Sequence, residues 1–215
     1  INVLLNITTG VIVDSDNLPT TWTIDNSPFN ITEPIVIDST QNVTFEPGIV
    51  IQVWNDEPIN ILGSLSANDV TFAPGFPDLF WGGLAITGTA GTRTESNFIN
   101  CEILNAINPI SIINSNPIIN TVYIAPIDTT AIINGTGITV IGVSCPAIDS
   151  VTILSYKTGI QVIRGEEYLP TEPIIHQLTL RNSSVSPRQE ENNTTGIVIA
   201  GKSNVIITDV DIKDY

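Results

Sequence analysis

The hexapeptide Ile148-Asp149-Ser150-Val151-Thr152-Ile153 carries apolar residues at its first, fourth and sixth positions and polar residues elsewhere. Similar hexapeptides recur at intervals of roughly 20 to 30 residues, a spacing typical of repeat architectures. Seven copies begin at Thr40, Ala67, Phe98, Ile119, Ile148, Ile175 and Ile207. The chain is therefore expected to be built from one structural unit that is repeated along its length.

A second short apolar alternation precedes most copies of the hexapeptide, so each unit holds at least two strands. The alternation occurs at Ile59-Asn60-Ile61, Leu84-Ala85-Ile86, Ile110-Ser111-Ile112, Ile138-Thr139-Val140, Ile160-Gln161-Val162 and Ile197-Val198-Ile199. No helical pattern separates the strands, and the period is too short for a βαβ unit or a propeller blade. The pattern predicts that each unit is one coil of a β-solenoid.

In such a solenoid, equivalent residues stack in columns about 4.8 Å apart. The fourth position holds Val43, Val70, Cys101, Val122, Val151, Leu178 and Val210, and the sixth holds Phe45, Phe72, Ile103, Ile124, Ile153, Leu180 and Ile212. Both columns are apolar and are predicted to face the interior, whereas the more polar fifth position is predicted to face water. The short polar residues at the second and third positions suit a corner between two strands.

Composition favours an all-β chain, because Ile, Val, Thr and Asn dominate and good helix formers are sparse. Hydrophobic residues make up 42 % and charged residues 13 %, which is enough apolar surface for a folded domain. The net charge of -15 excludes a nucleic-acid partner, since such proteins need a basic surface. No stretch reaches the roughly 20 apolar residues of a membrane span, so no membrane insertion is expected in this segment.

The two cysteines, Cys101 and Cys145, are not expected to pair, because Cys101 falls in the fourth-position column and Cys145 does not. Cys101 is predicted to be a small buried apolar residue. Sequons that would permit N-glycosylation in a secretory pathway start at Asn6, Asn30, Asn42, Asn134, Asn182, Asn192 and Asn193.

Residues 22–106 carry a further set of short motifs. They are Trp22-Thr23, Asn26-Ser27-Pro28-Phe29, Val43-Thr44-Phe45-Glu46-Pro47-Gly48-Ile49-Val50-Ile51, Gly63-Ser64-Leu65-Ser66-Ala67, Trp81-Gly82-Gly83-Leu84 and Asn100-Cys101-Glu102-Ile103-Leu104-Asn105-Ala106. This set resembles the right-handed parallel β-helix domains, of pectate-lyase-like fold, found in secreted and cell-surface proteins. The resemblance implies an extracellular or cell-surface location, and it is informative about architecture rather than chemistry.

The repeat and the resemblance together predict one continuous domain of about seven coils. Residues 1–33 are expected to form an N-terminal cap with the first strands, and residues 34–215 the β-helix. The C-terminal end is expected to be uncapped, with further coils or a partner chain beyond Tyr215. Lateral insertions at residues 88–96, 164–172 and 181–195 would be presented as surface loops.

A catalytic interpretation depends on carboxylates, because many parallel β-helices act on acidic polysaccharides. Only seven lysines and arginines occur, too few for a cluster that neutralises a polyuronate. His176, the sole histidine, falls in a corner column and is expected to be structural or exposed. Glu167, Asp209 and Asp211 are the candidate cluster for a polysaccharide hydrolase or lyase, or for loosely bound Ca²⁺.

The leading hypothesis is a non-catalytic structural or adhesive module, without a cofactor, of a larger secreted, cell-envelope or fibre protein such as a surface-layer protein or adhesin. Its expected partners are other copies or further domains of the same surface protein, and carbohydrate. The alternative is a carbohydrate-active enzyme that uses the surface carboxylates.

Overall fold

The computed structural model describes residues 10–16, 18–88, 95–128, 130–164, 173–181, 194–200 and 204–213. In these residues the structure is all-β apart from one short 3-10 helix, η1 (Ile24–Asn26). The strands are β1 (Val11–Val13), β2 (Thr21–Trp22), β3 (Phe29–Ile31), β4 (Val36–Ile37), β5 (Asn42–Phe45), β6 (Val50–Val53), β7 (Ile59–Ile61), β8 (Ser64–Asn68), β9 (Thr71–Pro74), β10 (Leu84–Thr87), β11 (Asn97–Ile99), β12 (Glu102–Leu104), β13 (Ile110–Ile113), β14 (Ile118–Asn120), β15 (Tyr123–Ala125), β16 (Ile133–Gly142), β17 (Ala147–Leu154), β18 (Tyr156–Arg164), β19 (Ile174–Arg181), β20 (Thr195–Ala200) and β21 (Ile206–Lys213).

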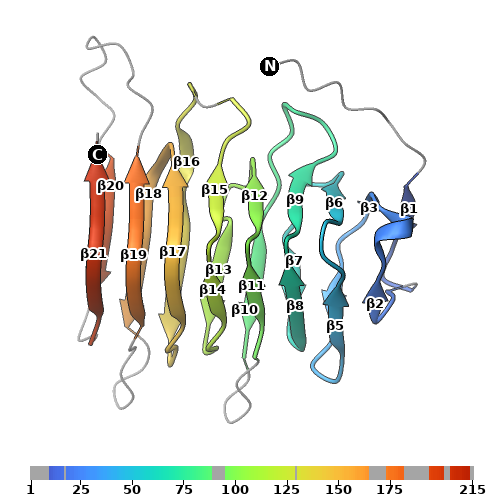
Figure 1. Ribbon diagram of the computed structural model, residues 1–215, viewed down its shortest axis with the longest axis horizontal. Helices are drawn as coiled ribbons and strands as arrows, with labels where there is room; N and C mark the ends of the chain where they lie inside the picture. Colours follow the sequence, from blue (N-terminus) through green and yellow to red (C-terminus); the bar gives the residue numbers. More distant parts are fainter. Residues whose placement is uncertain are drawn as a thin grey trace.

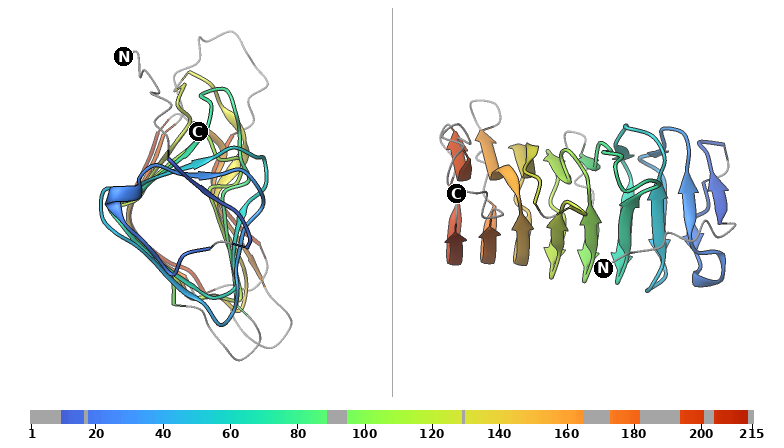
Figure 2. Two further views of the ribbon diagram at one scale, coloured as in Figure 1. Left: turned by 90° about the vertical axis from the view of Figure 1, so that its right-hand side faces the viewer. Right: turned by 90° about the horizontal axis from the view of Figure 1, so that it is seen from above.

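The described strands pair only in parallel, each with strands of the preceding and following repeats. One sheet has the order β20-β18-β16-β13-β10-β7-β4, and a 14-stranded sheet holds the others. Long strands such as β17 join both halves of that larger sheet, since β17 pairs with β14 and with β15. Viewed along the stack, the strands surround a common interior (Figure 2). The arrangement is compatible with the predicted parallel β-helix.

The register confirms the alignment of six of the seven hexapeptide copies. Ala67, Phe98, Ile119, Ile148, Ile175 and Ile207 form one continuous column, as their equivalent positions require. The copy at Thr40 is out of register, because Phe45 pairs with Ala67 at the first position and not with Phe72 at the sixth. Ile51 is the true partner of Phe72.

The interior columns are buried as the alternation predicts. Ile153 and Leu180 have exposed fractions of 0 %, and their neighbours in the column Phe72, Ile103 and Ile124 are equally buried. Ile212 is aligned with Leu180 but is 45 % exposed. Among the described residues, no strand stacks on the outer side of β21, so Ile212 is covered from one side only. Burial of an isoleucine is worth about 1.5–3 kcal/mol, which makes coverage by both neighbouring layers the main source of stability.

Residues 11–31 are already part of the stack. β1 pairs with β3, β3 with β6, and β2 with β5, all in parallel. Trp22 lies against the rings of Phe29 and Phe45, with centroid distances of 4.6 Å in both cases. Ring contacts continue from Phe45 through Phe72 to Phe98, so aromatic side chains follow one another through the core of the first layers. The predicted cap within residues 1–33 stays a prediction, because residues 1–9 lie outside the described part.

A single left-handed residue makes the corner between the hexapeptide's two strands. The third position has a positive φ of 49° to 57° in every copy that is in register, at Asp69, Asn100, Thr121, Ser150, Gln177 and Asp209. One such residue redirects the chain by a sharp angle without an inserted loop. The prediction that the short polar positions are corners is confirmed by these dihedral angles.

Cys101 is buried in the interior column, as predicted, and both cysteines are free. The Sγ of Cys101 lies 3.3 Å from the carbonyl oxygen of Ile99. Burial raises the pKa of the Cys101 thiol to about 11, so at neutral pH it is protonated and unreactive. No helix in the described residues is long and apolar enough to cross a membrane.

The corner column yields a stability prediction. Thr121 is exposed and β-branched, and it holds φ at 54°, a region that costs such residues about 1 kcal/mol relative to asparagine. We expect Thr121→Asn to raise the free energy of unfolding by about 0.5–1 kcal/mol in urea denaturation. The reverse change at the equivalent corner, Asn100→Thr, should lower it by a similar amount. If both substitutions changed the free energy of unfolding in the same direction, the corner assignment would be contradicted.

Candidate functional site

Two of the three candidate carboxylates, Asp209 and Asp211, lie on β21, but they do not share a site. Asp209 occupies the corner, where its Oδ2 lies 3.0 Å from Nε2 of His176. Asp211 lies beyond the corner, and its Oδ2 is 2.9 Å from Nζ of Lys213 and 3.5 Å from Nη2 of Arg181. Each carboxylate has a cationic partner of its own. Glu167, the third candidate, lies outside the described residues.

The charge state of Asp211 bears on catalysis. The Lys213 ammonium, which forms a hydrogen bond to Asp211, lowers the pKa of that carboxyl group, and Arg181 contributes further. A glycosidase general acid must keep its proton near neutral pH, which requires a raised pKa. Asp211 is therefore suited to an ion pair on the surface and not to proton donation.

His176 belongs to a polar ladder that crosses four layers. Asp149 and His176 are paired neighbours at the second hexapeptide position, and so are Asn120 and Asp149. Nδ1 of His176 lies 2.7 Å from Oδ1 of Asp149, and Nδ2 of Asn120 donates to Oδ2 of Asp149 at 3.3 Å. With Asp209 on the other side, the ladder reads Asn120, Asp149, His176, Asp209. Parallel pairing brings these side chains together, although each comes from a different repeat.

Both ring nitrogens of His176 face carboxylate oxygens, so only the doubly protonated imidazolium can donate to both. The hydrogen bond to Asp149 is the main cause that raises the pKa of His176; partial burial opposes it, and the charges of Asp149 and Asp209 add to it. The imidazole is 43 % exposed. This arrangement stabilises a surface cation between two anions.

The ladder lacks the geometry of nucleophilic catalysis. Ser150 is the hydroxyl residue next to Asp149, but its Oγ donates to Oε1 of Gln177 at 2.8 Å and not to His176. A catalytic histidine has to accept a proton from its nucleophile, and both nitrogens of His176 already face aspartates. The expectation that His176 is structural agrees with these contacts.

Three of the seven sequon asparagines lie in the described part of the chain. Asn42 and Asn134 are exposed. Asn30 is half-buried: its Oδ1 accepts the indole N–H of Trp54 at 2.9 Å, and its Nδ2 packs beside Gly10. A glycan attached to Nδ2 of Asn30 would need the space next to Gly10. Asn6, Asn182, Asn192 and Asn193 lie outside the described residues, as do most of the three predicted lateral insertions.

For Ca²⁺, the described residues contain no group of three or more histidine, cysteine, aspartate or glutamate side chains placed to hold a metal ion. The His176 ladder has two carboxylates, but both are directed at the imidazole. A bound cation would compete there with the imidazolium.

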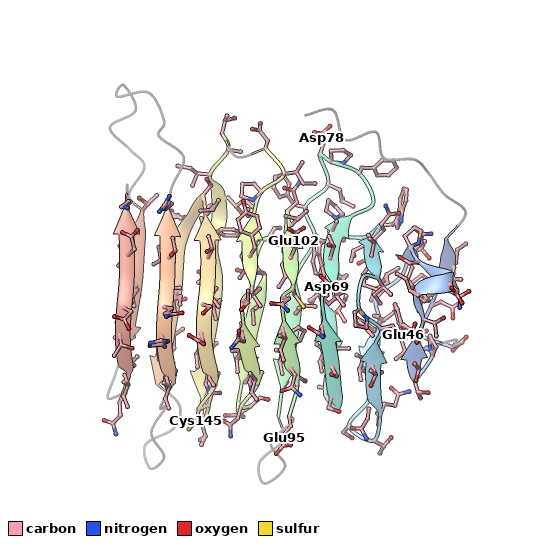
Figure 3. The ribbon with its side chains drawn as sticks, viewed as in Figure 1. Glu46, Asp69, Asp78, Glu95, Glu102 and Cys145 are labelled. Carbon is pink, nitrogen blue, oxygen red and sulfur yellow. The ribbon has the colours of Figure 1, made fainter. Side chains whose placement is uncertain are left out.

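A second surface comprises the loops that follow β1, β3, β6 and β9, residues 14–16, 32–34, 54–58 and 75–80, which we term the loop edge. These loops lie along one edge of the stack, at the top in Figure 1, where Asp78 is labelled in Figure 3. The loop edge carries two exposed phenylalanines, Phe76 and Phe80, and the half-buried Trp54. Its carboxylates are Asp14, Asp16, Glu33, Asp56, Glu57 and Asp78, and none of its residues is basic.

Packing holds the aromatic part of the loop edge in place. The rings of Trp54 and Phe76 meet edge to face at 4.6 Å. Gly75 packs so closely on the Trp54 indole that a Cβ there would overlap the ring. Asn105, only 3 % exposed, donates from Nδ2 to the carbonyl oxygens of Pro77 and Leu79. These contacts tie the 75–80 loop to the layers on both sides.

Two parts of this description were missed at the sequence level. The hexapeptide pattern predicts that Asp149 lies in a corner. It does not predict the contact with His176, although both residues share the second hexapeptide position. Trp54, Phe76 and Phe80 fall outside the repeat, so the interior columns predict nothing about them. A signal was present, since an aromatic residue in a loop after a strand has no interior column to occupy.

The ladder predicts how His176 titrates. Because its folded-state pKa is raised, its contribution to stability is fully present below pH 6.5 and is lost as the pH rises through the folded-state value. As the only histidine, His176 gives a single imidazole NMR signal, whose midpoint should lie above 6.5. Asp149→Asn should move the midpoint down, whereas Asp211→Asn should leave it in place. A wild-type midpoint at or below 6.5 would contradict the ladder.

The loop edge predicts an unequal response to ionic quenchers. Trp22 and Trp81 are buried, with exposed fractions of 1 % and 0 %, so quenchers reach mainly Trp54. The neighbouring carboxylates should enrich Cs⁺ and repel I⁻ near Trp54. We expect a larger Stern–Volmer constant for Cs⁺ than for I⁻ at low salt, with the difference shrinking at 1 M NaCl, where the screening length is about 3 Å. Neutral acrylamide serves as the control, and equal quenching by both ions would refute a negative potential there.

No family model matches this chain, and the comparisons with curated proteins and with solved structures also gave no match.

Proposed function

We propose that the chain is a right-handed parallel β-helix of about seven coils, of pectate-lyase-like type, that acts as a non-catalytic structural or adhesive module. In this proposal it belongs to a larger secreted, cell-envelope or fibre protein outside the cell. The helix is a rigid scaffold that presents lateral loops to other copies or domains of the same surface protein and to carbohydrate.

The observation that carries this proposal is the pairing of the candidate carboxylates. Asp209 pairs with His176, and Asp211 pairs with Arg181 as well as with Lys213 on its own strand, so each carboxylate contacts a cation of the preceding layer. A glycosidase needs two carboxyl groups that face one another across the substrate, at roughly 5–9.5 Å, with one of them protonated. The ion pairs instead favour a role in holding the stack together.

The continuity of the core supports a scaffold. One hydrophobic cluster extends from Val13 to Leu180, and each layer buries apolar residues against the next. A core of this kind couples neighbouring layers and resists bending. The net charge of -15 also favours solubility and disfavours anionic polymers as partners.

A polysaccharide panel tests the proposal against the enzyme alternative. The chain is incubated with neutral, acidic and amino polysaccharides, and reducing ends and unsaturated products are measured. We expect no turnover above a buffer control. Turnover that is lost in Asp209→Asn or Asp211→Asn, but retained in Asp25→Asn on η1, would overturn the proposal and favour a carbohydrate-active enzyme.

A further inference from the structure

We propose that the aromatic part of the loop edge, Trp54 with Phe76 and Phe80, is a docking surface for a cationic protein segment rich in arginine or lysine. The inference deepens the proposed function and rests on it, since it names the kind of partner that a scaffold loop would bind.

Exposure distinguishes this surface from the rest of the described chain. Phe76 is 55 % exposed and Phe80 39 %. They are the only aromatic residues among the large exposed apolar side chains of the described residues; the others are isoleucines and valines. Aromatic residues are enriched at protein interfaces and depleted on free surfaces. Two exposed phenylalanines in one six-residue loop therefore mark an interaction surface.

The surface is also preorganised. Gly75 packs directly on the Trp54 indole, Asn105 donates hydrogen bonds to the carbonyls of Pro77 and Leu79, and Asn30 accepts the Trp54 indole N–H. Asn105 is itself fixed, because its Oδ1 accepts the backbone N–H of Ile127. A partner that binds here pays little conformational entropy for ordering the loop.

Charge identifies the occupant. Asp56 and Glu57 lie two and three residues after Trp54, and Asp78 lies between Phe76 and Phe80; all three are exposed. The first 92 residues contain no lysine, arginine or histidine. A guanidinium or ammonium group can lie on an aromatic face while it pairs with a neighbouring carboxylate, and both contacts favour a cation. An anionic partner would be repelled.

A neutral carbohydrate fits this surface less well. Sugar binding commonly combines an aromatic platform with hydrogen-bond donors and acceptors. The indole N–H of Trp54 is already donated to Asn30, and the charged side chains nearby are all carboxylates, which only accept. The surface therefore offers many acceptors with few donors, which matches the donor-only groups of arginine and lysine.

The test is a fluorescence titration of the full chain with a synthetic (Arg-Gly)5 peptide. Trp54 is the half-buried tryptophan of the three, so it dominates any binding signal. We expect saturable binding that weakens as NaCl is raised. The matched peptide control carries neutral citrulline at every arginine and should not bind. Cellohexaose is the neutral oligosaccharide probe.

Variants separate this surface from general electrostatic attraction. Phe76→Ala should weaken binding about tenfold, whereas Phe76→Tyr should keep it, because the ring face is retained. Asp78→Asn should weaken binding and lower its salt dependence. Asp25→Asn, which removes an equal charge from η1 at a different corner of the stack, should have little effect (Figures 1 and 2). All variants are checked for unchanged urea unfolding.

Three outcomes would overturn the inference. The first is no binding of (Arg-Gly)5. The second is equal weakening by Asp25→Asn and Asp78→Asn with no effect of Phe76→Ala, which would indicate diffuse attraction. The third is cellohexaose binding that Phe76→Ala abolishes, which would indicate a carbohydrate site. These outcomes leave the scaffold proposal intact, whereas turnover in the polysaccharide panel would overturn that proposal without affecting peptide binding.

Discussion

Parallel backbone pairing in constant register is the constraint on which the rest of the structure depends. Once Ile148 is paired with Ile175, every following residue of β17 is aligned with its equivalent on β19, from Val151 with Leu178 to Leu154 with Arg181. A shift of one residue would turn each interior side chain to the solvent. The fully buried isoleucines, valines and leucines resist that shift, since each costs about 1.5–3 kcal/mol to expose.

The corner residues let the strands keep a constant register where the chain bends. β17, β19 and β21 each pass through a positive φ, at Ser150, Gln177 and Asp209, without losing alignment on either side. An inserted loop would let neighbouring layers drift, whereas a single left-handed residue adds no length. The left-handed residue at each corner costs about 1 kcal/mol of backbone strain. The aligned strand residues before and after the corner offset this cost.

Most of the stack could be predicted from the sequence, because its regularity lies in the chain itself. Six hexapeptides were aligned correctly by their apolar positions. The seventh was placed wrongly because three residues, Glu46, Pro47 and Gly48, separate Phe45 from Ile49, where the later copies have two. The apolar pattern of residues 40–45 imitates the hexapeptide, but its phenylalanine belongs to the first column.

The candidate site was less predictable, because its contacts combine different positions of the repeat. The pair Asp149 and His176 follows from equal positions in adjacent copies, and it could have been inferred. The contact of His176 with Asp209 could not, since Asp209 is a corner residue whose side chain direction depends on its positive φ. The aromatic contact of Trp54 with Phe76 likewise joins two loops of different length.

Stacking also governs where charge can accumulate. Identical charges in one column would lie about 4.8 Å apart and repel by about 1 kcal/mol per pair even in water. On the last layers charged side chains are compensated within the stack: His176 lies between Asp149 and Asp209 of the neighbouring layers, and Asp211 pairs with Arg181 of the preceding layer and with Lys213 on its own strand. The loops after β1, β3, β6 and β9 differ in length and are not bound to one column, so their carboxylates can spread apart. Uncompensated negative charge can therefore gather at the loop edge, beside the exposed phenylalanines, where a cationic partner would supply the compensation that the strands obtain from their neighbours.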